Sequence, residues 1–208
     1  MIAKKNRLIV FFPGWGDPVS VLKPMAERFQ LEGYDTHIVK YPGAHGTRLS
    51  ISETAKLISG EISRICFGPT LANQPVIFLG HSMGGLIAKE LSAHCTHYIS
   101  LATPHQGTTF AKLAPPKVVK SLTPSGYDMI PGSDYLRGLE AVSEALRAKP
   151  CLSVSGQFEE LVRPAKTTKF GDKHIIIPKA NHLTLPLVYR TFAEIYAWLT
   201  YEVFNELG

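Results

Sequence analysis

One serine in this sequence has the surroundings of a nucleophile. It stands in the segment GHSMGG, residues 80–85, between an apolar run and a helix-like pattern. A serine hydroxyl attacks a substrate only when a base removes its proton and when its side chain protrudes. A sharp turn from strand to helix makes the side chain protrude, and the flanking residues must be small because strand and helix approach closely there. We therefore predict that Ser82 is a nucleophile. The alternative is an N-cap serine that only begins a helix.

The rest of the chain alternates between short apolar, β-branched runs and longer segments of helical periodicity. This alternation predicts a parallel sheet covered by helices. The strand candidates lie at Leu8–Phe12, Thr36–Lys40, Val76–Leu79, Tyr98–Ala102, Cys151–Ser155 and Lys173–Ile177. Apolar residues recur at helical spacing from Ile51 to Ile65 and from Val188 to Val203. The expected fold is α/β, with a compact and mostly parallel sheet of about six strands flanked by helices.

The length of 208 residues and the hydrophobic content of 45% favour a single domain over residues 1–208. The segment 103–149 departs from the alternation, because proline-rich turns precede a predicted helix over Tyr135–Leu146. Such long connections often form a lid or a pocket wall, and a plain surface excursion is the other interpretation. Its apolar residues suggest an acyl-binding surface or, equally, a face buried against the sheet: Leu113, Val118, Val119, Leu122, Met129 and Ile130.

Composition and short motifs argue against several other classes of protein, namely those that bind nucleic acid, a cofactor or a metal. The net charge of +5 is spread along the chain, which indicates a solvated surface, with weak attraction to an anionic membrane surface or to nucleic acid as the alternative. No nucleic-acid-binding motif, phosphate-binding lysine loop or complete dinucleotide glycine pattern occurs, so we expect no nucleic acid and no cofactor. Neither the three cysteines nor the histidines have metal-ligand spacing, so we expect no metal site. The first apolar run, Leu8–Phe12, is too short for a signal peptide, and a cytoplasmic location is expected.

Taken together, the motifs resemble the α/β-hydrolase superfamily, and most closely its compact bacterial lipases and esterases. The similarity covers nearly the whole chain, through the segments VFFPGWG, GHSMGG, LATPHQGT, DMIPGSDYL and ANHLTL. Segments of the types TPHxGS and M-x-PGS-x-(F/Y)-L follow the nucleophile in that family, and they match residues 103–107 and 129–136 here. The resemblance implies a triad in the chain order serine, acid, histidine.

The base of such a triad is a histidine, which takes and returns a proton near neutral pH. Of the eight histidines, His182 lies after the last strand candidate and before the last helix, where the family's chain order places the base. His105 is assigned to the pocket wall, together with Met129. His81 precedes the nucleophile, so its side chain points elsewhere. The other five are expected at packing, surface or rim positions: His37, His45, His94, His97 and His174.

The resemblance places the acid after the strand at Cys151–Ser155, where the family has D-x-(I/L/V)-V. Here the sequence EELV aligns Glu159 with the usual aspartate. A glutamate carboxylate can still hold the imidazole tautomer and stabilise imidazolium, although its extra methylene requires a slightly withdrawn backbone. Glu160 and Asp172 are the alternatives, and a solvated pair of glutamates on a turn is the non-catalytic interpretation.

The tetrahedral intermediate needs backbone N–H donors for its oxyanion. One is expected from Met83, the residue after the nucleophile. The other is expected from Trp15, in the turn Pro13-Gly14-Trp15 after the first strand. The family usually has a histidine before the glycine of that turn, and here it is absent. The Trp15 side chain is open to two interpretations, a wall of the acyl pocket or a core aromatic.

The sequence thus predicts a serine hydrolase that cleaves carboxylic esters through an acyl-enzyme intermediate, with a small acyl ester or lipid as substrate. A thioesterase or an acyltransferase would use the same triad and is the alternative within enzymes. The alternative that is not an enzyme is a catalytically silent binding module.

Overall fold

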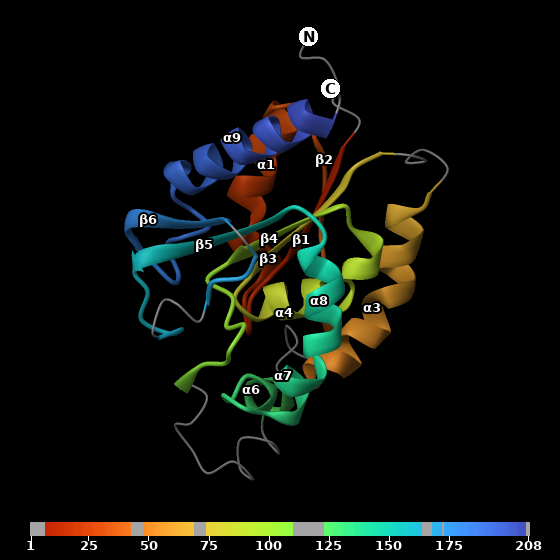
Figure 1. The fold of residues 1–208 in the computed structure, drawn as a ribbon, viewed down its shortest axis with the longest axis vertical. Helices are drawn as coiled ribbons and strands as arrows, with labels where there is room; N and C mark the ends of the chain where they lie inside the picture. Colours follow the sequence, from red (N-terminus) through yellow and green to blue (C-terminus); the bar gives the residue numbers. More distant parts are fainter. Residues whose placement is uncertain are drawn as a thin grey trace.

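The computed structural model describes residues 7–42, 48–68, 74–109, 123–163, 168–171 and 173–206. Six strands form one sheet, in the order β2-β1-β3-β4-β5-β6, and each neighbouring pair is parallel (Figure 1). The strands are β1 (Leu8–Phe12), β2 (Asp35–Ile38), β3 (Val76–His81), β4 (His97–Leu101), β5 (Cys151–Phe158) and β6 (Lys173–Asn181). The predicted parallel sheet is confirmed. Strands β3, β5 and β6 run two to four residues beyond their predicted ends, at the edge that carries the site.

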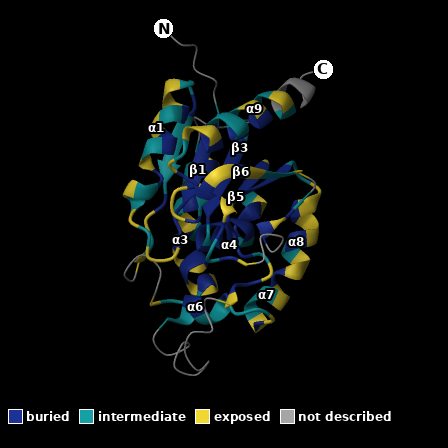
Figure 2. Ribbon diagram, turned by 90° about the vertical axis from the view of Figure 1, so that its left-hand side faces the viewer, coloured by how far each residue is buried: buried dark blue, intermediate teal, exposed yellow. Residues whose placement is uncertain are grey.

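Helices cover both faces of this sheet. They are α1 (Lys23–Leu31), α3 (Ile51–Cys66), α4 (Met83–Glu90), α6 (Pro124–Asp128), α7 (Asp134–Gly138), α8 (Glu140–Arg147) and α9 (Tyr189–Glu206), with short 3-10 turns at Val19–Val21 and Ser92–His94. Strand β1 alternates between the two faces: Val10 and Phe12 pack with α3, α4 and α8, whereas Ile9 and Phe11 pack with α1 and α9. Figure 2 shows buried central strands between helices that expose their outer faces. Among the described residues, no helix combines the length and apolar character needed to cross a bilayer.

Helix α3 begins where the sequence predicts it, because its first turn is capped in both directions. The Ser50 hydroxyl accepts a hydrogen bond from the Glu53 N–H at 3.1 Å, and the Glu53 carboxylate accepts one from the Ser50 N–H at 2.8 Å. The next N–H of the helix, that of Ile51, donates to Asp128 at 2.7 Å. Asp128 is the last residue of α6, so this bond fixes part of the long connection against α3.

The single helix predicted over Tyr135–Leu146 is wrong in its continuity, since the structure has two helices, α7 and α8, that meet at Leu139. Ser133 caps the N-terminus of α7, since its hydroxyl accepts a hydrogen bond from the Leu136 N–H at 3.2 Å. Helix α7 ends at Gly138, a residue that weakens a helix by roughly 1 kcal/mol relative to alanine, and α8 begins two residues later at Glu140. The acyl-surface candidates Leu113, Val118, Val119 and Leu122 lie outside the described residues. A lid or pocket-wall role for 103–149 stays a prediction.

Candidate active site

Ser82 lies in a strained turn between β3 and α4. Its φ is 51° and its ψ is −124°, a conformation that side chains rarely adopt outside glycine. The cost of such a backbone is on the order of 1–3 kcal/mol, and the surrounding hydrogen bonds hold it in place. The Ser82 N–H donates to the Leu101 carbonyl at 2.8 Å, and the Ser82 carbonyl accepts from the Gly85 N–H at 3.0 Å. No described residue hydrogen-bonds the half-buried hydroxyl, so it is not used as a helix cap.

Three glycines allow this turn to form, as the motif predicts. A Cβ at Gly80 would lie 2.4 Å from the backbone of Gly85, and one at Gly84 would lie 2.1 Å from the Phe12 carbonyl oxygen. A Cβ at Gly85 would lie 1.9 Å from Oγ1 of Thr103. These distances are far inside van der Waals contact. The strand, the helix and the end of β1 therefore meet at a spacing that no side chain could occupy.

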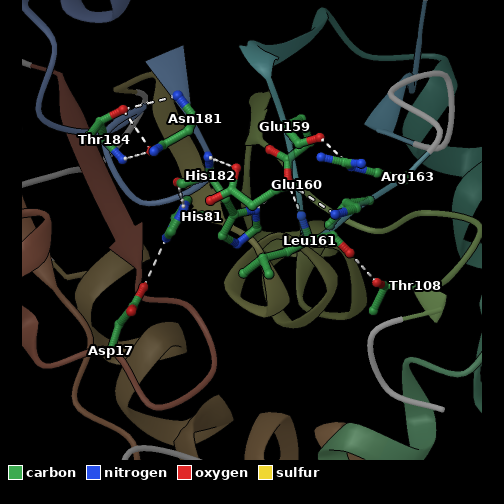
Figure 3. Close-up of polar contacts among 11 residues, drawn as sticks. Asp17, His81, Thr108, Glu159, Glu160, Leu161, Arg163, Asn181, His182 and Thr184 are labelled. Carbon is green, nitrogen blue, oxygen red and sulfur yellow. Dashed lines mark hydrogen bonds and ion pairs between the residues drawn. The ribbon is translucent and has the colours of Figure 1, made fainter. Parts of the chain in front are cut away.

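His182 follows β6 directly, and its ring is held by Glu159, the residue after β5 (Figure 3). Imidazole Nδ1 lies 2.7 Å from carboxylate Oε1, with 4% of the histidine side chain and 1% of the glutamate side chain exposed. Because an ionised carboxylate only accepts, the proton of this bond belongs to Nδ1. This leaves Nε2 as the nitrogen that can accept a proton.

The Glu159 carboxylate is oriented by its own turn. The same Oε1 accepts hydrogen bonds from the N–H groups of Leu161 at 3.1 Å and Val162 at 3.0 Å. The other oxygen is buried and has no partner among the described residues. Glu160, the first alternative acid, contacts the histidine in a different way, because its carboxylate accepts the His182 backbone N–H at 3.1 Å. Asp172, the second alternative, lies outside the described residues.

His81 shows how near His182 lies to Ser82. Strands β4 and β5 separate β3 from β6 in the sheet, so the base must reach back across the edge. Nε2 of His81 lies 3.1 Å from the backbone oxygen of His182, and the two rings lie 5.0 Å apart between centroids. The residue before the serine therefore contacts the predicted base directly. No hydrogen bond joins Ser82 and His182 in the part of the chain that is described, as is common before substrate binds.

The two predicted oxyanion donors face no acceptor among the described residues. Met83 is the first residue of α4, where an N–H has no intrahelical partner and the helix dipole favours negative charge. Trp15 lies in the turn after β1, and 40% of it is exposed, so it is a surface residue rather than a core aromatic. The neighbouring Gly14 N–H is different, because it donates to Asp17 at 3.1 Å.

Asp17 belongs to the site and was missed by sequence reasoning. Its carboxylate accepts from the Gly14 N–H and lies 2.8 Å from Nδ1 of His81. Burial by itself raises the pKa of the Asp17 carboxyl, but the hydrogen bond and charge of His81 and the Gly14 N–H bring that pKa below its usual value. Asp17 is therefore ionised at neutral pH. The sequence signal is slight: an aspartate three residues after a glycine, as in many hydrogen-bonded turns.

His105 lies apart from the predicted triad. Its Nε2 is 3.1 Å from the Ser100 hydroxyl, and its ring stacks on Phe170 at 4.9 Å. Burial, and then the charges of Lys89 and Arg147, keep the pKa of His105 well below its ordinary value, so the ring is neutral at pH 7. It lines a cavity of 410 Å³ together with Gln106, Gly132, Leu136, Arg137 and Glu140. This cavity is not lined by the predicted triad, and substrate contact by His105 stays a prediction.

Met129 lies in the hydrophobic core, 7% exposed, in the same cluster as Met83 and Leu86. Its backbone oxygen accepts a hydrogen bond from the Thr108 N–H at 2.8 Å. Its predicted contact with substrate likewise stays a prediction. Within the described ranges, no group of three or more histidine, cysteine, aspartate or glutamate side chains is arranged to hold a metal ion.

The amino-acid sequence matches no protein-family profile and no curated protein. Solved structures, however, resemble the fold. A lipase from Bacillus licheniformis has a TM-score of 0.65 at 16% identity, over 88% of this chain and 91% of that one. A peroxisomal α/β-hydrolase from Saccharomyces cerevisiae has a TM-score of 0.61 at 13% identity, over 92% of this chain and 77% of that one. A phospholipase from Legionella pneumophila has a TM-score of 0.57 at 14% identity, over 73% of this chain and 39% of that one. This chain therefore spans less than half of the length of the phospholipase.

Because these solved structures are only 13–16% identical to this chain, their similarity to it establishes the fold alone. The six-stranded parallel sheet, the helices on both faces and the strained serine between β3 and α4 agree with it. The chain therefore has the fold of the α/β-hydrolase superfamily.

Proposed function

We propose that this protein is a serine hydrolase of the lipase and esterase type, which cleaves carboxylic esters through an acyl-enzyme intermediate. The observation that carries the proposal is the buried bond of 2.7 Å between His182 Nδ1 and Glu159, on a loop that contacts the residue next to Ser82. A buried histidine held by a carboxylate beside a strained serine is the arrangement that activates a hydroxyl.

In this mechanism, the Ser82 oxygen attacks the ester carbonyl carbon while Nε2 of His182 takes the hydroxyl proton. Glu159 keeps the Nδ1 proton in place and stabilises the imidazolium that forms. The N–H groups of Met83 and Trp15 donate to the oxyanion, each contributing roughly 3–4 kcal/mol to lowering the barrier. The intermediate then collapses, Nε2 gives its proton to the leaving alkoxide, and the acyl group remains on Ser82. A water attacks in the same way and releases the carboxylic acid.

Three side chains next to the site are large, apolar and exposed. Phe158 precedes the predicted acid and is 59% exposed, and Leu183 follows the predicted base and is also 59% exposed. Trp15 is the last residue of the turn Pro13-Gly14-Trp15, the oxyanion turn. Exposed large apolar residues on the segments that carry a site are suited to an apolar substrate. They support a small acyl ester or a lipid as substrate, and the net charge of +5 supports weak contact with an anionic membrane surface.

The proposal is tested by hydrolysis of a nitrophenyl ester series of increasing acyl length, compared with the matching thioesters and with alcohol acceptors added. We expect oxygen esters to be cleaved, and Ser82→Ala to lose the activity with its circular dichroism spectrum unchanged. Ser52→Ala, on the exposed surface of α3, is the matched control and should behave as the wild type. Preference for thioesters or for acyl transfer would identify the alternative enzyme, and full activity in Ser82→Ala would refute the proposal.

A further inference from the structure

Asp17, which is partly buried, and His81, which is buried, form a pair that contacts three parts of the site. The Asp17 side chain is 16% exposed and that of His81 is 1% exposed. Asp17 reaches the oxyanion turn through the Gly14 N–H, and His81 reaches the backbone of the predicted base through the His182 oxygen. The unit itself ends one residue before Ser82. Figure 3 shows this chain of contacts from Asp17 to His182.

Both partners of the His81 ring are oxygen atoms that can accept a hydrogen bond. Nε2 faces a backbone carbonyl oxygen, which only accepts, so Nε2 must carry a proton. Nδ1 faces the carboxylate of Asp17, which also only accepts when ionised. Both ring nitrogens are therefore satisfied together only when His81 is an imidazolium. A neutral ring would leave one nitrogen lone pair directed at an oxygen lone pair.

The oxyanion turn is held closely against this ion pair. A Cβ at Gly14 would lie 2.5 Å from Oδ2 of Asp17 and 3.1 Å from Nδ1 of His81, so a side chain at position 14 would displace the Asp17 carboxylate. The Asp17 N–H donates back to the Gly14 oxygen at 3.2 Å, which closes the turn in both directions. On the other side, the Tyr41 hydroxyl donates to the Pro13 oxygen at 3.1 Å. Among the described residues, none accepts a hydrogen bond from the Trp15 N–H, the donor that the sequence assigns to the oxyanion.

We propose that Asp17 and His81 are positioning residues for the reaction: their ion pair sets the position of the Trp15 N–H relative to Ser82 and fixes the loop of His182. The inference rests on the proposed function. In this arrangement Asp17 supports the oxyanion turn, and Asp17 is itself held by His81, the residue before Ser82. An error of about 1 Å in such positioning costs on the order of 100-fold in rate.

The first test is spectroscopic and needs no variant. Nitrogen NMR of the protein labelled with ¹⁵N-histidine, at pH 7, should show both ring nitrogens of His81 carrying protons. In Asp17→Asn, one of them should lose its proton, because an amide cannot balance the imidazolium charge. A neutral His81 ring in the wild-type protein would overturn the inference, whatever the enzyme activity proves to be.

The second test is kinetic. Asp17→Asn should lower kcat for a nitrophenyl ester roughly 10- to 100-fold with little change in KM, and it should slow phosphonylation of Ser82 by a fluorophosphonate to a similar degree. His81→Gln should act likewise, and the double variant should be no slower than the slower single variant, because the two residues act as one unit. Asp134→Asn, which removes an exposed carboxylate, is the control and should leave kcat unchanged.

The two proposals fail in different ways. If Ser82→Ala stays active or Ser82 is never phosphonylated, the proposed function is wrong. If the wild-type protein depends on Ser82 but Asp17→Asn matches it in kcat and in phosphonylation rate, only the positioning role is wrong. Additive losses in the double variant would also contradict a shared role.

Discussion

Nδ1 of His182 lies 2.7 Å from Oε1 of Glu159, in surroundings that leave almost none of either side chain exposed. The glutamate oxygen at this bond also accepts two backbone N–H groups of its own turn, so its direction is fixed before substrate binds. Neighbouring Glu160 contacts only the backbone of the same histidine. The Glu159 carboxylate therefore lies where its charge can stabilise a protonated His182 ring, whereas the Glu160 carboxylate binds the backbone of His182.

Exchanging each glutamate for glutamine separates these roles. Glu159→Gln keeps an acceptor for Nδ1 but removes the buried charge that stabilises the imidazolium, a loss of about 3–5 kcal/mol, which corresponds to roughly 200- to 5,000-fold in kcat. Glu160→Gln keeps its acceptor for the His182 N–H and should change kcat less than about threefold. Ester hydrolysis under saturating substrate measures both. A larger loss in Glu160→Gln would show that the acid is misassigned.

Gly84→Ala should destabilise the protein strongly. The new Cβ would lie 2.1 Å from the Phe12 oxygen and 2.3 Å from the Pro13 oxygen, both backbone atoms that cannot rotate away. We expect the free energy of unfolding to fall by roughly 3 kcal/mol, with loss of activity as the oxyanion turn is displaced.

The matched control for that glycine is Gly60→Ala, on the exposed surface of α3, where nothing lies within 4 Å of the added Cβ. It should raise the free energy of unfolding by about 0.5–1 kcal/mol, because alanine favours the helix. Urea denaturation measures both variants. Equal effects in the two would contradict the close approach at Gly84.

Lys89 is a buried cation, 4% exposed, whose Nζ lies 4.4 Å from the centroid of the Phe170 ring. Burial lowers the pKa of Lys89 from 10.5 to about 8, with Glu140 opposing this shift and Arg147 adding to it. Between these two values the unfolded chain holds a proton that the folded chain has lost. The contribution of Lys89 to stability therefore becomes less unfavourable as pH rises through this window.

Substitution of Lys89 by methionine should remove that dependence. The difference in unfolding free energy between Lys89→Met and the wild type should shift by about 2 kcal/mol from pH 7 to pH 10, in favour of the wild type at the higher pH. Taking the difference cancels the titration of cysteines and tyrosines common to both proteins. Lys56→Met, on the exposed face of α3, serves as control and should show a flat difference. A flat difference for Lys89→Met as well would mean that its ammonium stays hydrated.

Much of the fold could be predicted because local pattern and tertiary structure agree. Strand β1 is apolar and buried throughout, and so is β3 over Val76–Leu79, so both strands could be located from their apolar runs. The break between α7 and α8 was missed because the apolar spacing continues across Gly138 and Leu139. There, one glycine outweighs a pattern that otherwise reads as one helix.

In the candidate site, residues within a motif could be proposed from the sequence, whereas contacts made only by the fold could not. Ser82, Glu159 and His182 stand in segments with a recognisable chain order. The contact between Asp17 and His81 joins two turns far apart in the sequence, and each residue alone has an ordinary local role. The contact forms only because the fold brings the ends of β1 and β3 together at one edge of the sheet.

The central claim is that Ser82 is the nucleophile of an acyl-transfer site. Its most direct test is mass spectrometry of the protein after reaction with a fluorophosphonate, which phosphonylates an activated serine with loss of fluoride. We predict one adduct per chain, on the peptide that contains Ser82, and none in Ser82→Ala. An adduct on another residue, or equal labelling of Ser82→Ala, would contradict the account.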